Sequence, residues 1–333
     1  MTGTRREFLG TLGVGIGLAA AAGLTPAARA VIRDPDPTFF TWKPLCEDVR
    51  VAFGEGGNTL LIEGKDAAIL VDCKNAPFGA TLRREAQALG TPVKLVINTH
   101  HHADHTGGNH AFTKDLPVIA QEKAKPRIAA RMDRYISQAK EAVLSLSNRK
   151  EPVPDKVKDE VKAYHDRMAQ LKPEEFQPKM LVTEGRELEV GGERVVLRYF
   201  GPGHTDNDLV VILPGRRIIH TGDLVFHKRH PFIDRDSGAS TAGWIECLRS
   251  VIELCDEKTT VVPGHGEVTD MSGIKMQIDY LHTVRDIVGK AIKAGTPREE
   301  VVKLTLEPFS TYAGEQNRPM TIGAVYDELK AGG

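Results

Sequence analysis

The chain has 333 residues, of which 41% are hydrophobic and 27% are charged. This is enough apolar material for a large core, in one domain or in one domain with additions. The formal net charge is −1 and the sequence has no basic stripe, so we expect a small-molecule substrate and no nucleic-acid partner.

Residues 1–30 have the pattern of an export signal. Arg5 and Arg6 form a twin-arginine pair, an apolar stretch rich in glycine and alanine follows, and the sequence "ARA" ending at Ala30 fits a small-x-small cleavage site. The pattern resembles a bacterial twin-arginine signal peptide. We therefore expect the twin-arginine export machinery to be a partner, and residues 31–333 to form a single domain in the periplasm. The apolar stretch is too short for a stable membrane span, so no stable membrane insertion is expected after cleavage.

Strands and turns alternate in the first part of this domain. Glycine turns separate apolar runs over residues 50–72, which predicts several strands. A helix is predicted over 81–89 and a buried strand over 92–98. The motif "NTHHHADHTGGN" begins at Asn98, at the carboxyl end of that buried strand. Open α/β sheets place their sites at such strand ends.

A segment with the composition of helices separates the two strand-rich halves. Residues 121–175 are rich in Lys, Glu, Ala, Gln and Arg and predict a helical insertion with a break at "EPVPD". This insertion could be a lid or one wall of a pocket, or a plain helical addition. Strands are predicted again over 193–200, 208–214, 216–222 and 259–264, with a helix over 243–255 and a helical extension over 285–333.

The same order of elements, a strand followed by a loop with ligand-type residues, occurs in both halves. This repetition predicts an α/β fold in which two mixed halves pack as a four-layer αββα sandwich. The four cysteines form no CxxC pair, so we expect free thiols rather than a zinc ribbon.

The motif after the buried strand has the pattern H-x-H-x-D-H. In an extended loop alternate residues point the same way, so His100 and His102 can hold one ion while His101 points elsewhere. Asp104 and His105 follow in the next turn and can face a second ion. Imidazole and carboxylate suit zinc, iron or manganese. Histidine-rich tracts are also compositional, so this motif alone leaves a polar surface loop open.

Three later residues support a metal centre. His204 lies in "GPGHTDND", Asp223 in "IIHTGDLVF" and His265 in "TTVVPGHGE", each at the end of a predicted strand and beside glycine. Glycine permits the tight backbone that brings a loop close to an ion. A lone histidine is more often structural, but seven such residues in this arrangement predict a metal site.

These motifs, taken in order over residues 45–285, resemble the metallo-β-lactamase superfamily. The resemblance implies an αββα sandwich with a binuclear metal site at its edge. It also implies which residues bind the two divalent ions, Zn²⁺ or alternatively iron or manganese. His100, His102 and His204 would bind the first ion, Asp104, His105 and His265 the second, and Asp223 would bridge them.

The resemblance further implies a hydrolase. Two ions lower the pKa of a bridging water, so that hydroxide can attack a carbonyl whose oxyanion a metal then stabilises. Asp104 is expected to accept a proton from the nucleophile, and Asp104 and Asp223 are the expected catalytic residues. The expected bond is ester-like or amide-like, as in a lactone, a thioester or a β-lactam.

Two departures from the zinc β-lactamases affect the substrate. The best-known subclass has cysteine where this chain has Asp223, and lysine where it has Phe226. The stretch "GDLVFHKRHPFID" is more similar to secreted metallohydrolases, some of them associated with quinoprotein systems or β-lactamase-like. In it, Lys228, Arg229 and His230 could bind a substrate anion or form a solvated loop.

Two other activities stay open. Sulfur dioxygenases resemble the same superfamily but use a single iron, and the ligand set does not exclude such an oxidoreductase. A phosphodiesterase is the other alternative, against which the export signal and the absence of a basic patch both count.

Overall fold

The computed structural model describes residues 38–332. The expected signal peptide and its cleavage site after Ala30 therefore lie outside the described residues. Residues 39–332 lie in one compact unit, which is described below. Among its helices within the described range, none is long and apolar enough to cross a membrane.

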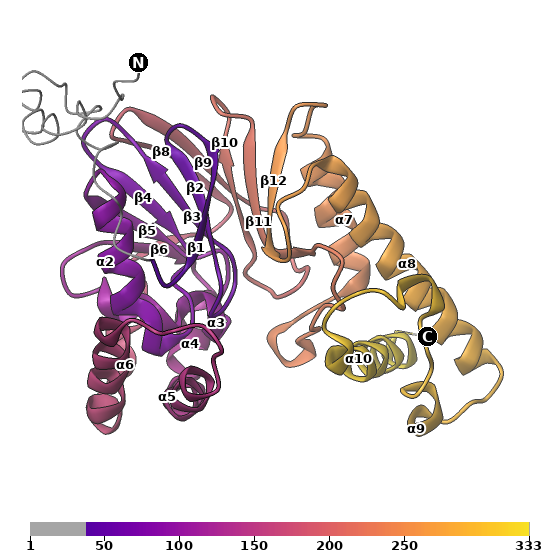
Figure 1. Cartoon of the computed structure of the whole chain (residues 1–333). Helices are drawn as coiled ribbons and strands as arrows, with labels where there is room; N and C mark the ends of the chain where they lie inside the picture. Colours follow the sequence, from indigo (N-terminus) through magenta and orange to yellow (C-terminus); the bar gives the residue numbers. More distant parts are fainter. Residues whose placement is uncertain (1–37, 333) are drawn as a thin grey trace, which may run out of the picture. The chain divides into compact units, whose positions relative to one another are not determined.

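The first sheet is built from strands of the N-terminal half (Figure 1). Its strands follow one another in chain order, antiparallel from β1 to β4 and parallel from β4 to β7. They are β1 (Thr41–Cys46), β2 (Val49–Phe53), β3 (Thr59–Glu63), β4 (Ala68–Val71), β5 (Val93–Ile97), β6 (Val118–Gln121) and β7 (Met180–Val182).

The second sheet has the order β12-β11-β10-β9-β8. All its neighbours are antiparallel except β11 and β12, which are parallel. Its strands are β8 (Gly185–Val190), β9 (Glu193–Tyr199), β10 (Leu209–Leu213), β11 (Ile218–Phe226) and β12 (Thr260–His265).

Apolar side chains from both sheets meet in one buried layer. Leu60 and Ile97 of the first sheet pack in the same cluster as Val195 and Val211 of the second. A separate cluster joins α2 (Gly79–Leu89) to the outer face of the first sheet. A third joins α7 (Thr241–Ile252) and α8 (Met271–Lys293) to the outer face of the second. The predicted αββα sandwich is confirmed.

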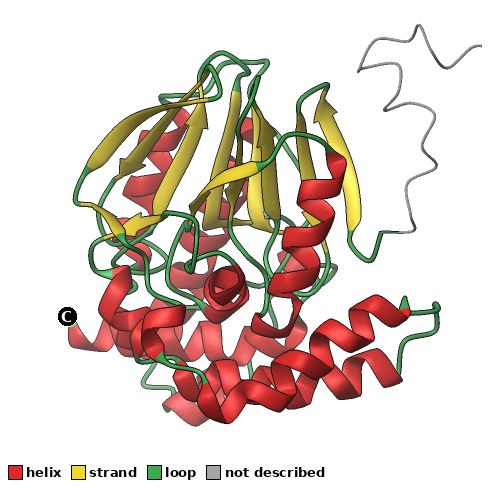
Figure 2. Cartoon of the chain, turned by 90° about the vertical axis from the view of Figure 1, so that its left-hand side faces the viewer, coloured by secondary structure: helices red, strands yellow, loops and turns green. Residues whose placement is uncertain are grey.

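The remaining helices gather at one end of the two sheets (Figure 2). A further buried cluster joins the insertion to Ala76, Ala103 and Ala120 of the preceding chain. In it the rings of Tyr135 and Phe176 stack, with their centroids 4.2 Å apart. The helical insertion and the helical C-terminal extension are both present, as predicted. They comprise α4 (Ala124–Ala129), α5 (Met132–Ser147) and α6 (Asp155–Arg167), then α9 (Arg298–Val301) and α10 (Arg318–Ala331).

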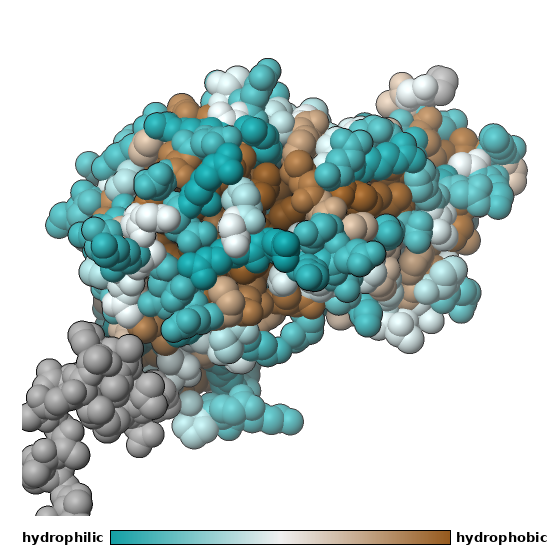
Figure 3. Space-filling view, turned by 90° about the horizontal axis from the view of Figure 1, so that it is seen from above, coloured by the Kyte–Doolittle hydropathy of each residue, from teal (hydrophilic) through white to brown (hydrophobic). Residues whose placement is uncertain are grey.

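The opposite end carries strand-connecting loops. Seen from above, its surface is largely hydrophilic, with apolar residues visible between polar ones (Figure 3). All four cysteines are free thiols, and Cys73 and Cys247 are buried. The expectation of free thiols is therefore confirmed.

One strand differs from its predicted extent in a way that matters for the site. β11 continues through Asp223 to Phe226, whereas the sequence pattern placed Asp223 just past a strand ending at Gly222. Gly222 has a φ of +51°, and the pairing of β11 with β12 shifts register on both sides of it. Glycine tolerates this conformation, so the strand is irregular here without ending.

Candidate metal centre

The structure brings all seven predicted ligand residues together at the helical end of the sandwich. Two of the seven are histidines in the loop between β5 and the short helix α3 (Ala103–Thr106). Two more, an aspartate and a histidine, lie in α3 itself. One further residue comes from the loop between β9 and β10, one from β11 and one from the end of β12. In chain order they are His100, His102, Asp104, His105, His204, Asp223 and His265.

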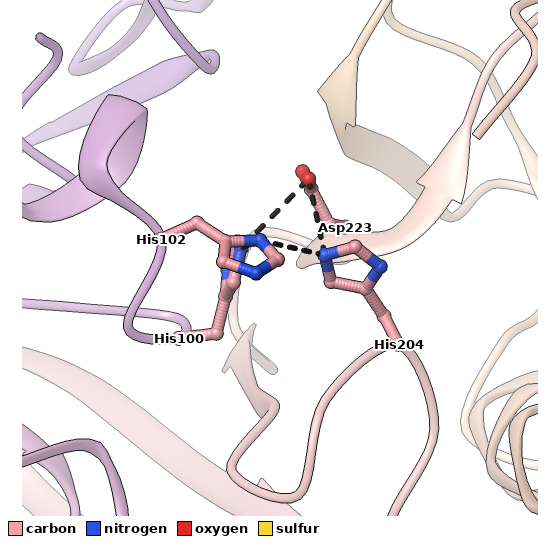
Figure 4. Close-up of side chains that lie close together, drawn as sticks. All are labelled: His100, His102, His204 and Asp223. Atoms are coloured by element: carbon pink, nitrogen blue, oxygen red, sulfur yellow. Dashed lines mark hydrogen bonds and ion pairs between the residues drawn. The ribbon is translucent and has the colours of Figure 1, made fainter. Parts of the chain in front are cut away.

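Four of these residues form a first cluster (Figure 4). The Nε2 atoms of His100 and His204 each lie 3.0 Å from the Nδ1 atom of His102. The Oδ2 atom of Asp223 lies 3.8 Å from Nε2 of His100 and 3.5 Å from Nε2 of His204. Ligand atoms about 2.1 Å from a tetrahedral zinc are separated by roughly 3.4 Å, so these spacings fit one ion.

The other three residues form a second cluster that also reaches Asp223. The Nε2 atom of His265 lies 3.1 Å from Oδ2 of Asp104 and 3.4 Å from Nε2 of His105. Asp223 contacts both histidines, with Oδ1 3.2 Å from His105 Nε2 and Oδ2 3.4 Å from His265 Nε2. The Asp223 carboxylate is therefore common to both clusters.

Hydrogen bonds fix which nitrogen of His102 faces the first cluster. Its Nε2 atom lies 2.9 Å from Oδ2 of Asp234. Because a carboxylate only accepts, Nε2 carries the proton and Nδ1 keeps the lone pair that can bind an ion.

Asp72 does the same for two other histidines. Its Oδ2 atom accepts a hydrogen bond from His105 Nδ1 at 2.7 Å and another from Thr99 Oγ1 at 2.7 Å. Thr99 Oγ1 has thus used its own proton and accepts one from His100 Nδ1, 3.0 Å away. In the neutral rings, the Nε2 atoms of His100 and His105 are left with the lone pairs that face the clusters.

Burying the ligand groups without a bound cation costs free energy of folding. His100, His105 and His204 are buried, and Asp223 is only 4% exposed. The Oδ1 atom of Asp223 accepts no hydrogen bond of normal geometry within the described residues. A buried carboxylate needs a compensating partner, and a metal ion between the histidines would supply one. The residues present therefore fit the divalent ions that the sequence implies.

The pKa values differ between the two clusters. Burial lowers the pKa of His204 to about 3, and it also takes the pKa of His100 well below the ordinary value. Burial acts in the same direction on His265, but the carboxylates of Asp223 and Asp104 outweigh it and raise that pKa to about 9. At neutral pH the second cluster therefore holds a proton where an ion would bind.

A cavity of about 580 Å³ lies over the two clusters. The insertion forms one side of it, through Arg131, Arg134 and Gln138. The insertion is therefore a wall of the pocket rather than a plain addition. The facing side is lined by Phe226, Arg229, His230, Phe232, Gln316 and Asn317.

His101 is buried and points away from the two clusters, as predicted. Its ring contacts Asn207, Arg131 and Ser237. Asp72 could have been found from the sequence, because a polar residue follows the apolar run "AAILV" there as it does at the ligands. Asp234 carries no such signal, since it lies in an irregular loop after β11.

Comparison with known proteins gives the family. The family model described as Metallo-beta-lactamase superfamily matches residues 52–265 of this chain. The metallo-beta-lactamase type 2 of Bacillus cereus is 32% identical over 94 residues, which cover 28% of this chain and 37% of that enzyme. The acyl-coenzyme A thioesterase MBLAC2 of Homo sapiens is 24% identical over 225 residues, which cover 64% of this chain and 74% of the thioesterase.

A solved structure supports the fold alone. The metallo-beta-lactamase from Pontibacter korlensis superposes with a TM-score of 0.53 at 20% sequence identity, over 73% of this chain and 99% of that one. Since the family match spans well over half of the chain, the chain belongs to the metallo-beta-lactamase superfamily.

Proposed function

We propose that the protein is a hydrolase of ester-like or amide-like bonds that works with two divalent metal ions. The observation that carries the proposal is the sharing of Asp223 between the two clusters. His100, His102 and His204 would hold one ion, and Asp104, His105 and His265 the other. Two such ions, when bound, supply Lewis acidity and a water of lowered pKa.

The protein's own residues would orient the substrate and move the proton. Asp104 is 32% exposed and lines the cavity, so a substrate can approach it. Burial opposes ionisation of Asp104, but His105 and His265 outweigh it and hold the pKa of this carboxyl well below its usual range. Asp104 is therefore ionised at neutral pH, and it can accept a proton from the attacking water.

The cavity walls favour an acyl compound that is both anionic and partly apolar. Arg229 is half-buried in the wall, and its side chain makes no ion pair or hydrogen bond with any residue from 38 to 332. An unpaired guanidinium in a pocket suits a carboxylate or a phosphate. Phe226 and Phe232 offer apolar surface beside it. Both a thioesterase and a β-lactamase among the relatives act on acyl compounds, which agrees with this class.

The test is a substrate panel run with metal analysis on the same preparation. The protein is loaded with Zn²⁺, its bound ions are counted, and it is assayed with an acyl thioester, a lactone, a β-lactam and a phosphodiester. The proposal expects two ions and turnover of at least one acyl substrate. Turnover of the phosphodiester alone, or oxygen consumption with a persulfide and a single iron, would replace it with one of the two alternatives.

We also propose that the protein acts in the periplasm. Support comes from the twin-arginine pair Arg5-Arg6 and the cleavage site at Ala30. Mass spectrometry of the native protein should give a mature chain starting at Val31. A chain that keeps Met1 and stays in the cytoplasm would contradict this.

A further inference from the structure

A third group of potential ligands lies beside the first cluster. His101, His102 and Asp234 each offer an atom within 4.8 Å of the others. His102 thus belongs to two groups, with Nδ1 facing the first cluster and Nε2 facing Asp234. An ion bound to the third group would bind His102 through Nε2, and not through the Nδ1 atom that faces the first cluster.

The guanidinium of Arg131 already contacts this third group. Its Nη2 atom lies 2.7 Å from Oδ2 of Asp234 and 3.0 Å from Nε2 of His101. A guanidinium can only donate, so His101 accepts at Nε2 and Asp234 stays ionised. Arg131 is a fixed positive charge where a metal ion would otherwise neutralise the carboxylate.

Asp234 is held by several donors at once. Its Oδ2 atom accepts from His102, from Arg131 and from Ser237 Oγ at 2.6 Å. The carboxylate is only 9% exposed. Because Arg131 and Ser237 fix the orientation of Asp234, this carboxylate accepts the hydrogen bond from Nε2–H of His102 in only one orientation of the imidazole ring.

Arg131 comes from the insertion, immediately before α5. The insertion is anchored a second time, where Arg127 forms two hydrogen bonds to Asp206, at 2.8 and 2.6 Å. Asp206 is two residues from His204, in the same loop. The insertion is therefore attached to the loop that carries His204 and, where Arg131 contacts His101, to the loop that carries the other two histidines of the first cluster.

We propose that Arg131 is a positioning residue that acts through Asp234 to keep His102 as an Nδ1 ligand and to keep metal ions out of the third group. This inference rests on the proposed metal set. It assigns to the insertion a role in metal binding that is separate from its role as a pocket wall. Loss of partners that orient a metal ligand lowers metal affinity by 10- to 100-fold.

The experiment measures the affinity for the first Zn²⁺ ion by competition with a chelator, and the absorption spectrum of the Co²⁺ form. Arg131→Ala should weaken first-ion binding about 10- to 100-fold and change the Co²⁺ spectrum. Arg131→Lys keeps the positive charge but loses the planar guanidinium, so its affinity for the first ion should lie between those of the wild type and Arg131→Ala. The matched control is Lys140→Ala, because Lys140 is an exposed cation on α5, the helix that Arg131 directly precedes. This variant should bind Zn²⁺ like the wild type.

A double-mutant cycle tests the route through Asp234. If Arg131 acts through Asp234, the double variant Arg131→Ala/Asp234→Ala should bind the first ion no more weakly than Asp234→Ala alone. Additive losses would overturn the proposal, as would wild-type affinity in Arg131→Ala with only a lowered melting temperature. Should Arg131→Ala fail to fold, Arg131→Lys and Arg131→Gln carry the same comparison. A wild type that binds no ion would refute the proposed function instead.

Discussion

The Nε2 atom of His105 lies 3.2 Å from the Oδ1 atom of Asp223, and this contact joins the second cluster to the first. The other oxygen of the same carboxylate lies 3.5 Å from His204. The same oxygen lies 3.4 Å from Nε2 of His265. One side chain in the middle of β11 therefore contacts histidines from three separate segments of the chain.

Replacing Asp223 by asparagine should remove the shared charge with little change in shape. We expect the second ion to bind more weakly and the hydrolytic rate to fall at least about a hundredfold, the scale of losing a well-placed catalytic group. Metal content and turnover should be measured on one preparation. Wild-type values for both would show that Asp223 does not bind metal.

Gly264 permits the position of Asp223. A Cβ atom at Gly264 would lie 1.8 Å from Oδ1 of Asp223 and 2.8 Å from its backbone nitrogen. Gly264→Ala should therefore displace the carboxylate and reduce both metal content and activity. Gly215→Ala is the control, because a Cβ there meets nothing within 4 Å. Equal activity in the two variants would contradict this account.

Asp72→Asn tests the tautomer argument. Asp72 has a φ of +65°, which asparagine tolerates better than most residues, so the backbone should be kept. The amide oxygen cannot replace both carboxylate oxygens, and the amide nitrogen would face the protons of His105 or Thr99. We expect the affinity for the second ion to fall about 10- to 100-fold, measured by chelator competition. Asp66→Asn, on an exposed turn, should have no effect.

Metal binding should depend on pH differently at the two clusters. Below pH 9, His265 must lose a proton before its nitrogen can bind an ion, because carboxylates raise its pKa to about 9 against the effect of burial. Burial also acts on His105, but Asp223 and Asp104 outweigh it and raise that pKa well above its ordinary value. Affinity for the second ion should thus rise at least about tenfold for each pH unit between about 6 and 8. His204, whose pKa burial lowers to about 3, has no proton to lose there, so first-ion affinity should change little. Parallel pH profiles for both ions would be the contrary result.

Arg229 should discriminate between anionic and neutral substrates. Arg229→Ala should raise KM for an acyl substrate with a carboxylate or phosphate, about 10-fold or more on the scale of a charged hydrogen bond. A neutral ester assayed with the same variant is the control and should keep its KM. Equal increases for both substrates would mean that Arg229 shapes the pocket without binding the anion.

The sequence predicted the seven clustered residues because each is a ligand-type side chain close after an apolar run, and three of them, His204, Asp223 and His265, lie beside glycine. That pattern depends only on local order, and so do the buried strands and the amphipathic helices. Strands β6 and β7 were not predicted, since each pairs with a strand far away in the sequence. Strands β1 and β8 pair with the strand that follows them, but they are largely exposed and so lack the apolar run that marks a buried strand. The roles of Arg131 and Asp234 were not predicted either, because 103 residues separate these two side chains, which form a hydrogen bond.

The attachment of the insertion to the metal centre limits how the pocket can be redesigned. Arg134 and Gln138 line the cavity, and their side-chain hydrogen bonds within the described residues go to residues other than the clustered histidines, so libraries at these positions can vary substrate range while the chemistry is retained. Arg131 lines the same cavity yet bonds Asp234. Exchange of the whole insertion with that of a relative would therefore transplant specificity only if an arginine is kept at this position.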